Sequence, residues 1–176
     1  MKEQNDNNSG PLAGIKVVDV SSAVAGPWVS SWLAEFGADV VFIEKVGTPD
    51  VMRMTGATSG DQSGCWVHMH RNKRGMDLDV RSDVGRDILM QLVSEADVFI
   101  QNFRPGVAER LKIAYPDLSG ANPDLIYLSV SGFGAEGPYV DRPVYDPIIQ
   151  AISGMADCLL YTSPSPRDAT LSGMAA

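Results

Sequence analysis

Small residues and cations follow the predicted strands of this chain, and their chemistry suits an anionic ligand. Four such segments occur, at residues 21–27, 45–47, 102–106 and 131–134. Their glycine and serine residues let a ligand approach the backbone closely, and Lys45 and Arg104 supply positive charge. Each segment alone is typical of an ordinary turn. Because parallel strands end at a common edge, where open α/β proteins bind ligands, the four segments together predict a binding crevice.

Basic residues also cluster just beyond position 70. Four of the 14 Lys and Arg residues of the chain stand there, as Arg71, Lys73, Arg74 and Arg81. Such a run is often a solvated surface. Here it lies beside a glycine-containing segment, and Arg110 adds a further cation on a later helix. Local positive charge of this kind favours a multiply phosphorylated ligand.

Tyr145 and Asp146 open the last predicted helix, shortly after the glycine-containing segment that follows the fourth strand. An acidic side chain at this position can simply cap the helix. The functional alternative is that both side chains point into the crevice. Tyrosine would then donate a hydrogen bond, and aspartate would act as an acid, a base or an orienting group.

Two other patterns resemble cofactor sites but lack what such sites need. Residues 132–137 match the G-x-G-x-x-G dinucleotide fingerprint, yet Pro138 and Pro143 stand where its helix should open. The second pattern has no fourth metal ligand at a suitable spacing and comprises Cys65, His68 and His70. Cys65 as a nucleophile has no established base. We therefore expect neither NAD nor a bound metal.

Composition and charge exclude several classes of protein. The chain has 176 residues, a formal net charge of −8, 44% hydrophobic and 20% charged residues, and two cysteines. These values predict one globular domain with reduced thiols in the cytoplasm, and argue against a disulfide scaffold and a nucleic-acid partner. No apolar run approaches the ~20 residues of a membrane span. The polar N-terminus is unlike a secretory signal, and residues 1–10 are expected to be a disordered leader.

The elements that must position these residues alternate along the chain. Short β-branched runs predict strands at 15–20, 39–44, 97–100 and 125–130. Apolar periodicity and capping residues predict helices at 28–36, from Ser82 to Ala96, from Pro105 and from about Asp146, with a further turn or helix before Asn122. Residues 46–70 are expected to form a long loop. This order predicts an α/β fold with an open, mostly parallel, Rossmann-like sheet and helices on both faces.

Several of these segments together resemble a known family. The ordered motifs are AGP at 25–27, NKR…LD at 72–79, NFRPG at 102–106, and SGFG…GP…D from Ser131 onward. From Pro11 to about Ala156 the sequence resembles the class III CoA-transferases, the CaiB/BaiF family. That family includes formyl-CoA transferases, carnitine CoA-transferases and α-methylacyl-CoA racemases.

The resemblance implies that coenzyme A or an acyl-CoA is the substrate and that a small carboxylic acid is the other partner. The family's CoA contacts fall on Val24, Ala25, Lys45, Leu78, Asp79, Val80, Arg81, Asn102, Phe103, Arg104 and Arg110. Tyr145 and Asp146 fall on positions beside the acyl group. Racemase members usually carry histidine where Tyr145 stands, which favours a transferase. An acyl-CoA racemase or epimerase, working by proton abstraction next to the thioester, is the alternative.

The resemblance also implies how much of the protein is present. Family transferases use an aspartate nucleophile in a G-D-x-x-G-like segment beyond the position of Asp146, and this chain has none; Asp168 lacks the flanking glycines and is not assigned. Family members are longer and form interlocked homodimers. We therefore expect a truncated, N-terminal CoA-binding part in residues 11–157, non-catalytic as it stands. Residues 158–176 have no pattern and resemble a read-through peptide of non-native origin.

Overall fold

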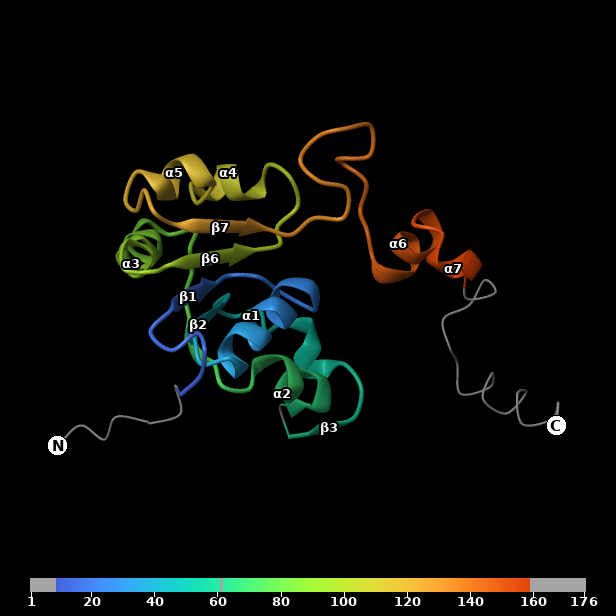
Figure 1. Ribbon diagram of the computed structural model, residues 1–176, viewed down its shortest axis with the longest axis horizontal. Helices are drawn as coiled ribbons and strands as arrows, with labels where there is room; N and C mark the ends of the chain where they lie inside the picture. The colour runs from blue at the N-terminus through green and yellow to red at the C-terminus, as the bar shows by residue number, and fades with distance from the viewer. Residues whose placement is uncertain (1–8, 61, 159–176) are drawn as a thin grey trace. The chain divides into compact units, whose positions relative to one another are not determined.

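A five-stranded parallel sheet forms the centre of the first of two structural units (Figure 1). The computed structural model describes residues 9–60 and 62–158. The strands of this sheet are β1 (Lys16–Asp19), β2 (Asp39–Glu44), β5 (Arg74–Asp77), β6 (Val98–Gln101) and β7 (Ile126–Ser129). Their order is β5-β2-β1-β6-β7, and all neighbouring pairs are parallel. The order reverses between β1 and β6, where open α/β sheets form their ligand crevice.

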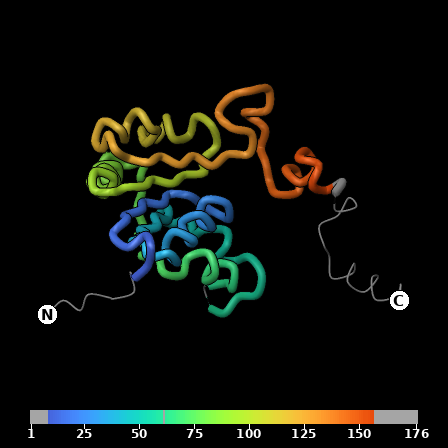
Figure 2. The backbone as a smooth tube through the Cα atoms, in the orientation of Figure 1, coloured from blue at the N-terminus to red at the C-terminus, as the bar shows by residue number. Residues whose placement is uncertain are grey.

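Helices cover both faces of this sheet, as the sequence predicted, and Figure 2 traces the backbone through the layers. The helices of the first unit are α1 (Ala25–Glu35), α2 (Gly64–His70), α3 (Asp83–Ser94), α4 (Val107–Leu111) and α5 (Tyr115–Ser119). Because side chains alternate along a strand, Val17 of β1 packs toward α1 whereas Val18 packs toward α3, α4 and α5. The parallel sheet is therefore buried on both sides, which explains its β-branched strands.

Local sequence signals place most of these elements correctly. The predicted strand at 39–44 coincides with β2, and β1 is shorter than predicted by one residue at each end. Helix α1 begins three residues before the predicted start, and Gly37 follows it with a φ of +99°, which glycine adopts freely. The Ser82 hydroxyl accepts a 3.0 Å hydrogen bond from the Gly85 amide, which caps α3 as predicted.

The predicted long loop at 46–70 is wrong over most of its length. It contains η1 (Val51–Met54), the short strands β3 (Thr58–Ser59) and β4 (Gln62–Ser63), and helix α2. Helix α2 forms because Ser63 caps the amide of Trp66 at 3.0 Å, while Trp66 and Met69 are buried against Phe42. Only two buried residues anchor this short helix, so apolar periodicity was too weak to reveal it.

The sequence also missed strand β5. Its four residues are all exposed and include Gly75, so neither alternation nor β-branched residues marked it as a strand. It forms through backbone pairing with β2, where Phe42 pairs with Gly75 and Glu44 with Asp77. An edge strand of this kind owes its structure to the neighbouring strand and not to its own side chains.

The second unit begins at Gly132 and is described by itself. Residues 132–145 form turns and bends, and helices α6 (Asp146–Ile152) and α7 (Met155–Cys158) follow. None of the helices in the described part of the chain is long and apolar enough to cross a membrane. Most of the leader and tail predicted at 1–10 and 158–176 lies outside the described residues.

Candidate functional site

A cleft of about 590 Å³ opens at the carboxyl edge of the sheet in the first unit, and we call it the strand-edge cleft. Its walls come from the segments that follow β1, β2, β5 and β6. Val20, Ile43 and Leu78 give it an apolar floor, since each is buried near the end of its own strand. The shared edge of parallel strands therefore brings together segments that lie far apart in the sequence.

Seven of the eleven CoA contacts implied by the family resemblance line this cleft. They are Lys45, Leu78, Asp79, Val80, Arg81, Phe103 and Arg110. The other four implied contacts are not part of its lining, namely Val24, Ala25, Asn102 and Arg104. Asn102 still contacts a residue of the cleft wall. Its side-chain amide accepts a hydrogen bond from the Ser22 amide at 2.9 Å and donates one to the Ser22 carbonyl at 2.7 Å. Ser22 is itself a lining residue.

The basic residues of the cleft differ in whether an acidic side chain already pairs with them. Arg81 donates to the carboxylate of Asp79 at 2.8 and 3.1 Å, and this contact lowers the pKa of Asp79 and raises that of Arg81. Lys45 and Arg110 form no ion pair with any acidic side chain in the described part of the chain. These two cations are therefore available to an anionic ligand without first breaking an internal ion pair.

A buried polar network lies beneath the loop that follows β1. Asp19 is fully buried and accepts hydrogen bonds from the hydroxyls of Ser21 and Ser30. The ammonium of Lys73 lies 3.6 Å from Asp19 and donates to the Pro27 carbonyl at 2.7 Å. Burial lowers the pKa of Lys73 to about 8, and the nearby Asp19 carboxylate acts in the opposite direction. This network joins β1, the first turn of α1 and the residue before β5.

The predicted cation cluster at positions 71–81 is wrong as a single site. Each of its four members contacts a different acidic residue: Arg71 with Glu35, Lys73 with Asp19, Arg74 with Asp39, and Arg81 with Asp79. The backbone explains this separation, because Asn72 adopts a left-handed φ of +62° and β5 then runs along the sheet edge. Only Arg81 reaches the strand-edge cleft.

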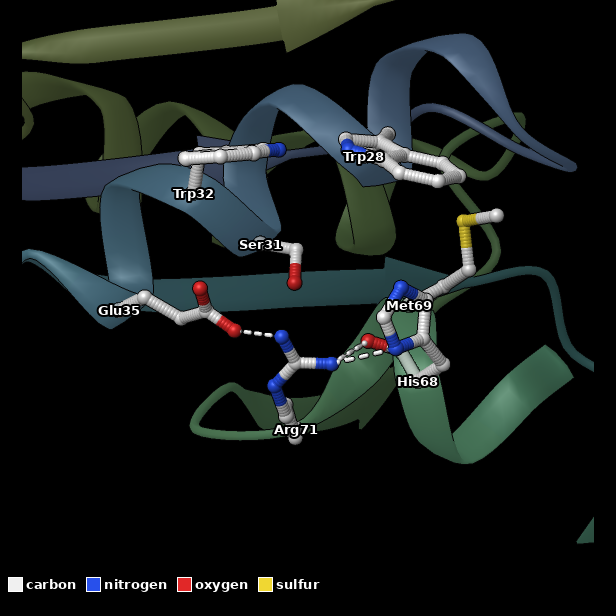
Figure 3. A pocket seen from close by; sticks show the side chains of 7 residues that line it. All are labelled: Trp28, Ser31, Trp32, Glu35, His68, Met69 and Arg71. Atoms are coloured by element: carbon white, nitrogen blue, oxygen red, sulfur yellow. Dashed lines mark hydrogen bonds and ion pairs between the residues drawn. The ribbon is translucent and has the colours of Figure 1, made fainter. Parts of the chain in front are cut away.

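Arg71 lies instead in a smaller pocket of about 200 Å³ lined by side chains of α1 and α2 (Figure 3). Its guanidinium contacts the carboxylate of Glu35 and donates to the His68 carbonyl at 2.9 Å. Trp28 packs edge-to-face on His68 with ring centroids 5.5 Å apart. Arg71 therefore lies in a different pocket from Arg81 and does not line the strand-edge cleft.

Tyr145 and Asp146 belong to the second unit. Tyr145 is 76% exposed and directly precedes α6, where its side chain makes no capping hydrogen bond. Asp146 is the first residue of α6 and accepts a hydrogen bond from the Gln150 side chain. The N-cap position of α6 is Tyr145, so Asp146 does not cap the helix, although a carboxylate in its first turn is favourable to the helix dipole. The assignment of both residues to an active site stays a prediction.

The remaining candidate residues have structural surroundings. Residues 132–137 do not enter a helix, since α6 begins only at Asp146. His70 stacks on Trp66 with ring centroids 3.8 Å apart and contacts Phe42 in a tilted arrangement at 4.2 Å, and neither of its ring nitrogens has a hydrogen-bond partner. Burial lowers the pKa of His70 to about 3. Within the described residues, no group of three or more His, Cys, Asp or Glu side chains is placed to hold a metal ion.

Sequence reasoning missed an acidic pair in the wall that follows β2. Glu44 accepts from Arg53 at 2.7 and 2.9 Å, and this contact lowers the pKa of Glu44. Asp50 is 7% exposed and caps η1 by accepting from the Met52 amide at 2.8 Å. An aspartate directly before a short helix is a capping signal, and it could have marked Asp50 in the sequence.

Comparison with known proteins gives a consistent family. A sequence profile described as CoA-transferase family III matches residues 12–173. The alpha subunit of succinyl-CoA–L-malate CoA-transferase from Chloroflexus aurantiacus is 40% identical over 158 residues, which are 89% of this chain and 37% of that protein. Succinyl-CoA:glutarate CoA-transferase from Homo sapiens is 32% identical over 176 residues, covering 99% of this chain and 40% of the relative. The chain spans 35–40% of the length of the curated relatives that it matches.

Solved structures agree with the sequence relatives. A CaiB/BaiF family protein from Brucella suis has a TM-score of 0.77 and 37% identity, covering 89% of this chain and 42% of that one. A hypothetical protein, Rv3272, from Mycobacterium tuberculosis has a TM-score of 0.78 and 29% identity, covering 91% and 43%. With the parallel sheet and its strand-edge cleft, these similarities show that the chain belongs to CoA-transferase family III, the CaiB/BaiF family.

Proposed function

We propose that this chain is the N-terminal, CoA-binding part of an acyl-CoA:carboxylate CoA-transferase. The observation that carries the proposal is the lining of the strand-edge cleft, where Lys45, Arg81 and Arg110 stand around an apolar floor. Coenzyme A combines phosphate groups with an apolar adenine and a pantetheine arm, so its binding calls for cations and apolar surface in one site. The family membership supports the same ligand.

The binding role of each wall follows from its chemistry. Lys45 and Arg110, which form no ion pair with the described residues, contact the phosphates, and Arg81 adds a guanidinium that Asp79 orients. Leu78, Val80 and Phe103 supply the apolar contacts for the adenosine end. The pantetheine arm, which leads to the thioester, then lies between the cleft walls that follow β1 and β2.

Transfer chemistry would involve residues beyond this chain. In the intact protein, an aspartate carboxylate attacks the acyl-CoA carbonyl carbon and releases CoA thiolate, giving a mixed anhydride. The thiolate then attacks the aspartyl carbonyl and releases the donor acid, and the acceptor carboxylate finally takes CoA through a second anhydride. We place Tyr145 and Asp146 in supporting roles near the acyl group, and the nucleophile outside the 176 residues. The intact protein would act on a small carboxylic acid as an interlocked homodimer.

Calorimetry with coenzyme A tests the binding proposal on the chain itself. We expect saturable binding that weakens with added salt, because phosphate contacts with exposed cations are screened. Arg110→Gln should weaken binding about tenfold, the scale of one charge-assisted hydrogen bond. Lys16→Gln is the matched control. Lys16 is the first residue of β1, at the end of the strand away from the cleft, and it pairs with Glu95. Absence of binding at millimolar coenzyme A would overturn the proposal.

Assays on a longer gene product separate transfer from racemisation. A transferase moves CoA from an acyl donor to an acceptor acid and accumulates a trappable aspartyl-CoA adduct. A racemase instead exchanges the hydrogen next to the thioester with deuterated solvent, and needs no acceptor acid. Deuterium incorporation without CoA transfer would favour the racemase alternative.

A further inference from the structure

The loop that joins β1 to α1 contains a backbone conformation that its own residue does not favour. Ala23 adopts a φ of +61°, in the left-handed region where a side chain crowds the backbone. Such a conformation persists only where surrounding contacts determine it. Ala23 stands directly after Ser21 and Ser22, which line the strand-edge cleft. The backbone conformation of Ala23 therefore sets the position of these two residues in the cleft wall.

One carboxylate provides that determining contact. The amide of Ala23 donates to Oδ2 of Asp50 at 2.8 Å, while Oδ1 of Asp50 accepts from the Met52 amide, also at 2.8 Å. Asp50 is 7% exposed, and its bond to Met52 is buried while its bond to Ala23 is partly buried, so water has limited access to compete for the two donors. The two oxygens thus join the loop after β1 to the loop after β2.

Asp50 is itself held in place from the neighbouring strand. Its amide donates to Glu44 at 2.7 Å, and Arg53 engages both oxygens of the Glu44 carboxylate, at 2.9 and 2.7 Å. The guanidinium of Arg53 also lies 3.7 Å from the Trp66 ring centroid. The chain of contacts therefore runs from the packed helix α2 to Ala23, and leaves Asp50 little freedom to move.

We infer that Asp50 is a positioning residue of the strand-edge cleft, which holds Ala23 left-handed and so sets the wall at Ser21 and Ser22 for coenzyme A. The effect on coenzyme A rests on the proposed function, whereas the effect on Ala23 does not. Aspartate suits this role because it accepts from two amides at once. Asparagine has the same shape but a single, uncharged oxygen, so it cannot accept from Ala23 and Met52 as the carboxylate does, and any bond that it keeps to Ala23 is weaker.

The first experiment measures backbone amide exchange of Ala23 in the 176-residue chain without ligand. We expect Asp50→Asn to accelerate this exchange about tenfold or more, because the amide loses its charged acceptor. Asp117→Asn is the matched control, since the Asp117 carboxylate accepts from the Ala114 amide at 3.1 Å at the start of α5, outside the cleft. Unchanged Ala23 exchange in Asp50→Asn would overturn the inference.

The second experiment measures coenzyme A affinity by calorimetry. Asp50→Asn should weaken binding about tenfold, and adding Ala23→Gly should restore much of it, because glycine adopts a positive φ without a carboxylate to hold it. A merely structural role of Asp50 predicts no such restoration, and its absence would contradict the inference. Should Asp50→Asn not fold, Ala23→Val supplies the test, since a β-branched residue resists φ of +61° and should weaken binding while Asp50 is intact. A wild-type chain that binds no coenzyme A overturns the proposed function, and the exchange of Ala23 still decides the role of Asp50.

Discussion

Asp19 and Lys73 place opposite charges where almost no water reaches them, with side-chain exposures of 0% and 1%. The exposed pair of Lys16 and Glu95 has the same chemistry at exposures of 52% and 74%. A buried charge that loses its partner is costly, because water cannot take the place of that partner. An exposed charge is solvated with or without a partner. At the scale of single residues, burial therefore decides how much an ion pair matters here.

Asp19→Asn should destabilise the protein by about 3 kcal/mol at pH 7, since it leaves the Lys73 ammonium buried without a counter-charge. Glu95→Gln, in the exposed pair, should cost less than about 1 kcal/mol. Urea denaturation of both variants measures the two values. The cost of Asp19→Asn should shrink above pH 8, because the pKa of Lys73 is about 8 and neutral lysine needs no counter-charge. Equal costs in the two variants would contradict this account.

His70 should make stability depend on pH below neutrality. Burial between Trp66 and Phe42 lowers its pKa from 6.5 to about 3, so the unfolded chain binds a proton more readily than the native chain between these values. Above pH 6.5 His70 is neutral in both states and costs no stability. As the pH falls from 6.5 toward 3, the free energy of unfolding decreases by at most about 1.4 kcal/mol per pH unit. Urea denaturation of wild type and His70→Phe from pH 4 to 8 isolates it, because other groups titrate in both proteins. Parallel pH curves would show that His70 has no such role.

Close backbone packing fixes α3 against the cleft at the scale of elements. A Cβ atom on Gly85 would lie 2.1 Å from the Asp79 carbonyl oxygen, whereas one on Gly64 at the start of α2 would meet nothing within 4 Å. Asp79 follows β5 and lines the strand-edge cleft. The first turn of α3 and the cleft wall are therefore in direct contact, and neither can move without the other.

Gly85→Ala should destabilise the protein by about 1–3 kcal/mol, the usual cost of forcing an extra methyl group into packed structure. It should also weaken coenzyme A binding, because the displaced Asp79 orients Arg81. Gly64→Ala should do neither, as its added methyl group meets open space. Urea denaturation and calorimetry of the two variants measure both effects. A Gly85→Ala protein as stable as Gly64→Ala would show that the backbone yields at little cost.

At the scale of the whole molecule, the chain holds a cleft of about 590 Å³ but spans 35–40% of the length of its curated relatives. The strand-edge cleft is built entirely from residues before Ser131. The proposal that this unit binds coenzyme A therefore does not depend on the rest of the chain. Under the proposed function, the first unit suffices to bind coenzyme A, and the transfer step requires the aspartate that we place beyond these residues.

The 176-residue chain should accordingly bind coenzyme A but transfer none, while a gene product of the relatives' length should transfer it. Chromatography of an acyl-CoA incubated with small dicarboxylic acids measures formation of the new thioester in each preparation. The longer protein without its G-D-x-x-G aspartate should match the short chain. Transfer by the short chain itself would show that the nucleophile lies within it.

Sequence patterns predicted the strands with β-branched residues and the helices with clear caps, because local energetics alone favour them. They also predicted a crevice after the strands, and the family motifs identified seven residues that line it. Strand β5 and helix α2 were missed because their stability comes from β2 and from the Phe42 surface, which no local pattern records. The basic run near position 70 was misread for a related reason, since the acidic partners of Arg71, Lys73 and Arg74 are distant in sequence.

Residue order alone therefore settled the α/β class, the parallel sheet and the family, because hydrophobic period, capping residues and ordered motifs are properties of the chain itself. The tertiary structure decided which charges remain available to a ligand. Lys45 and Arg110 face the cleft without an ion pair among the described residues, whereas Lys73 is buried against Asp19. It also brought Asp50 to the amide of Ala23 across 27 positions. Such contacts form because the parallel strands end at one edge and bring their following loops together. No local sequence pattern records which remote residues will meet there.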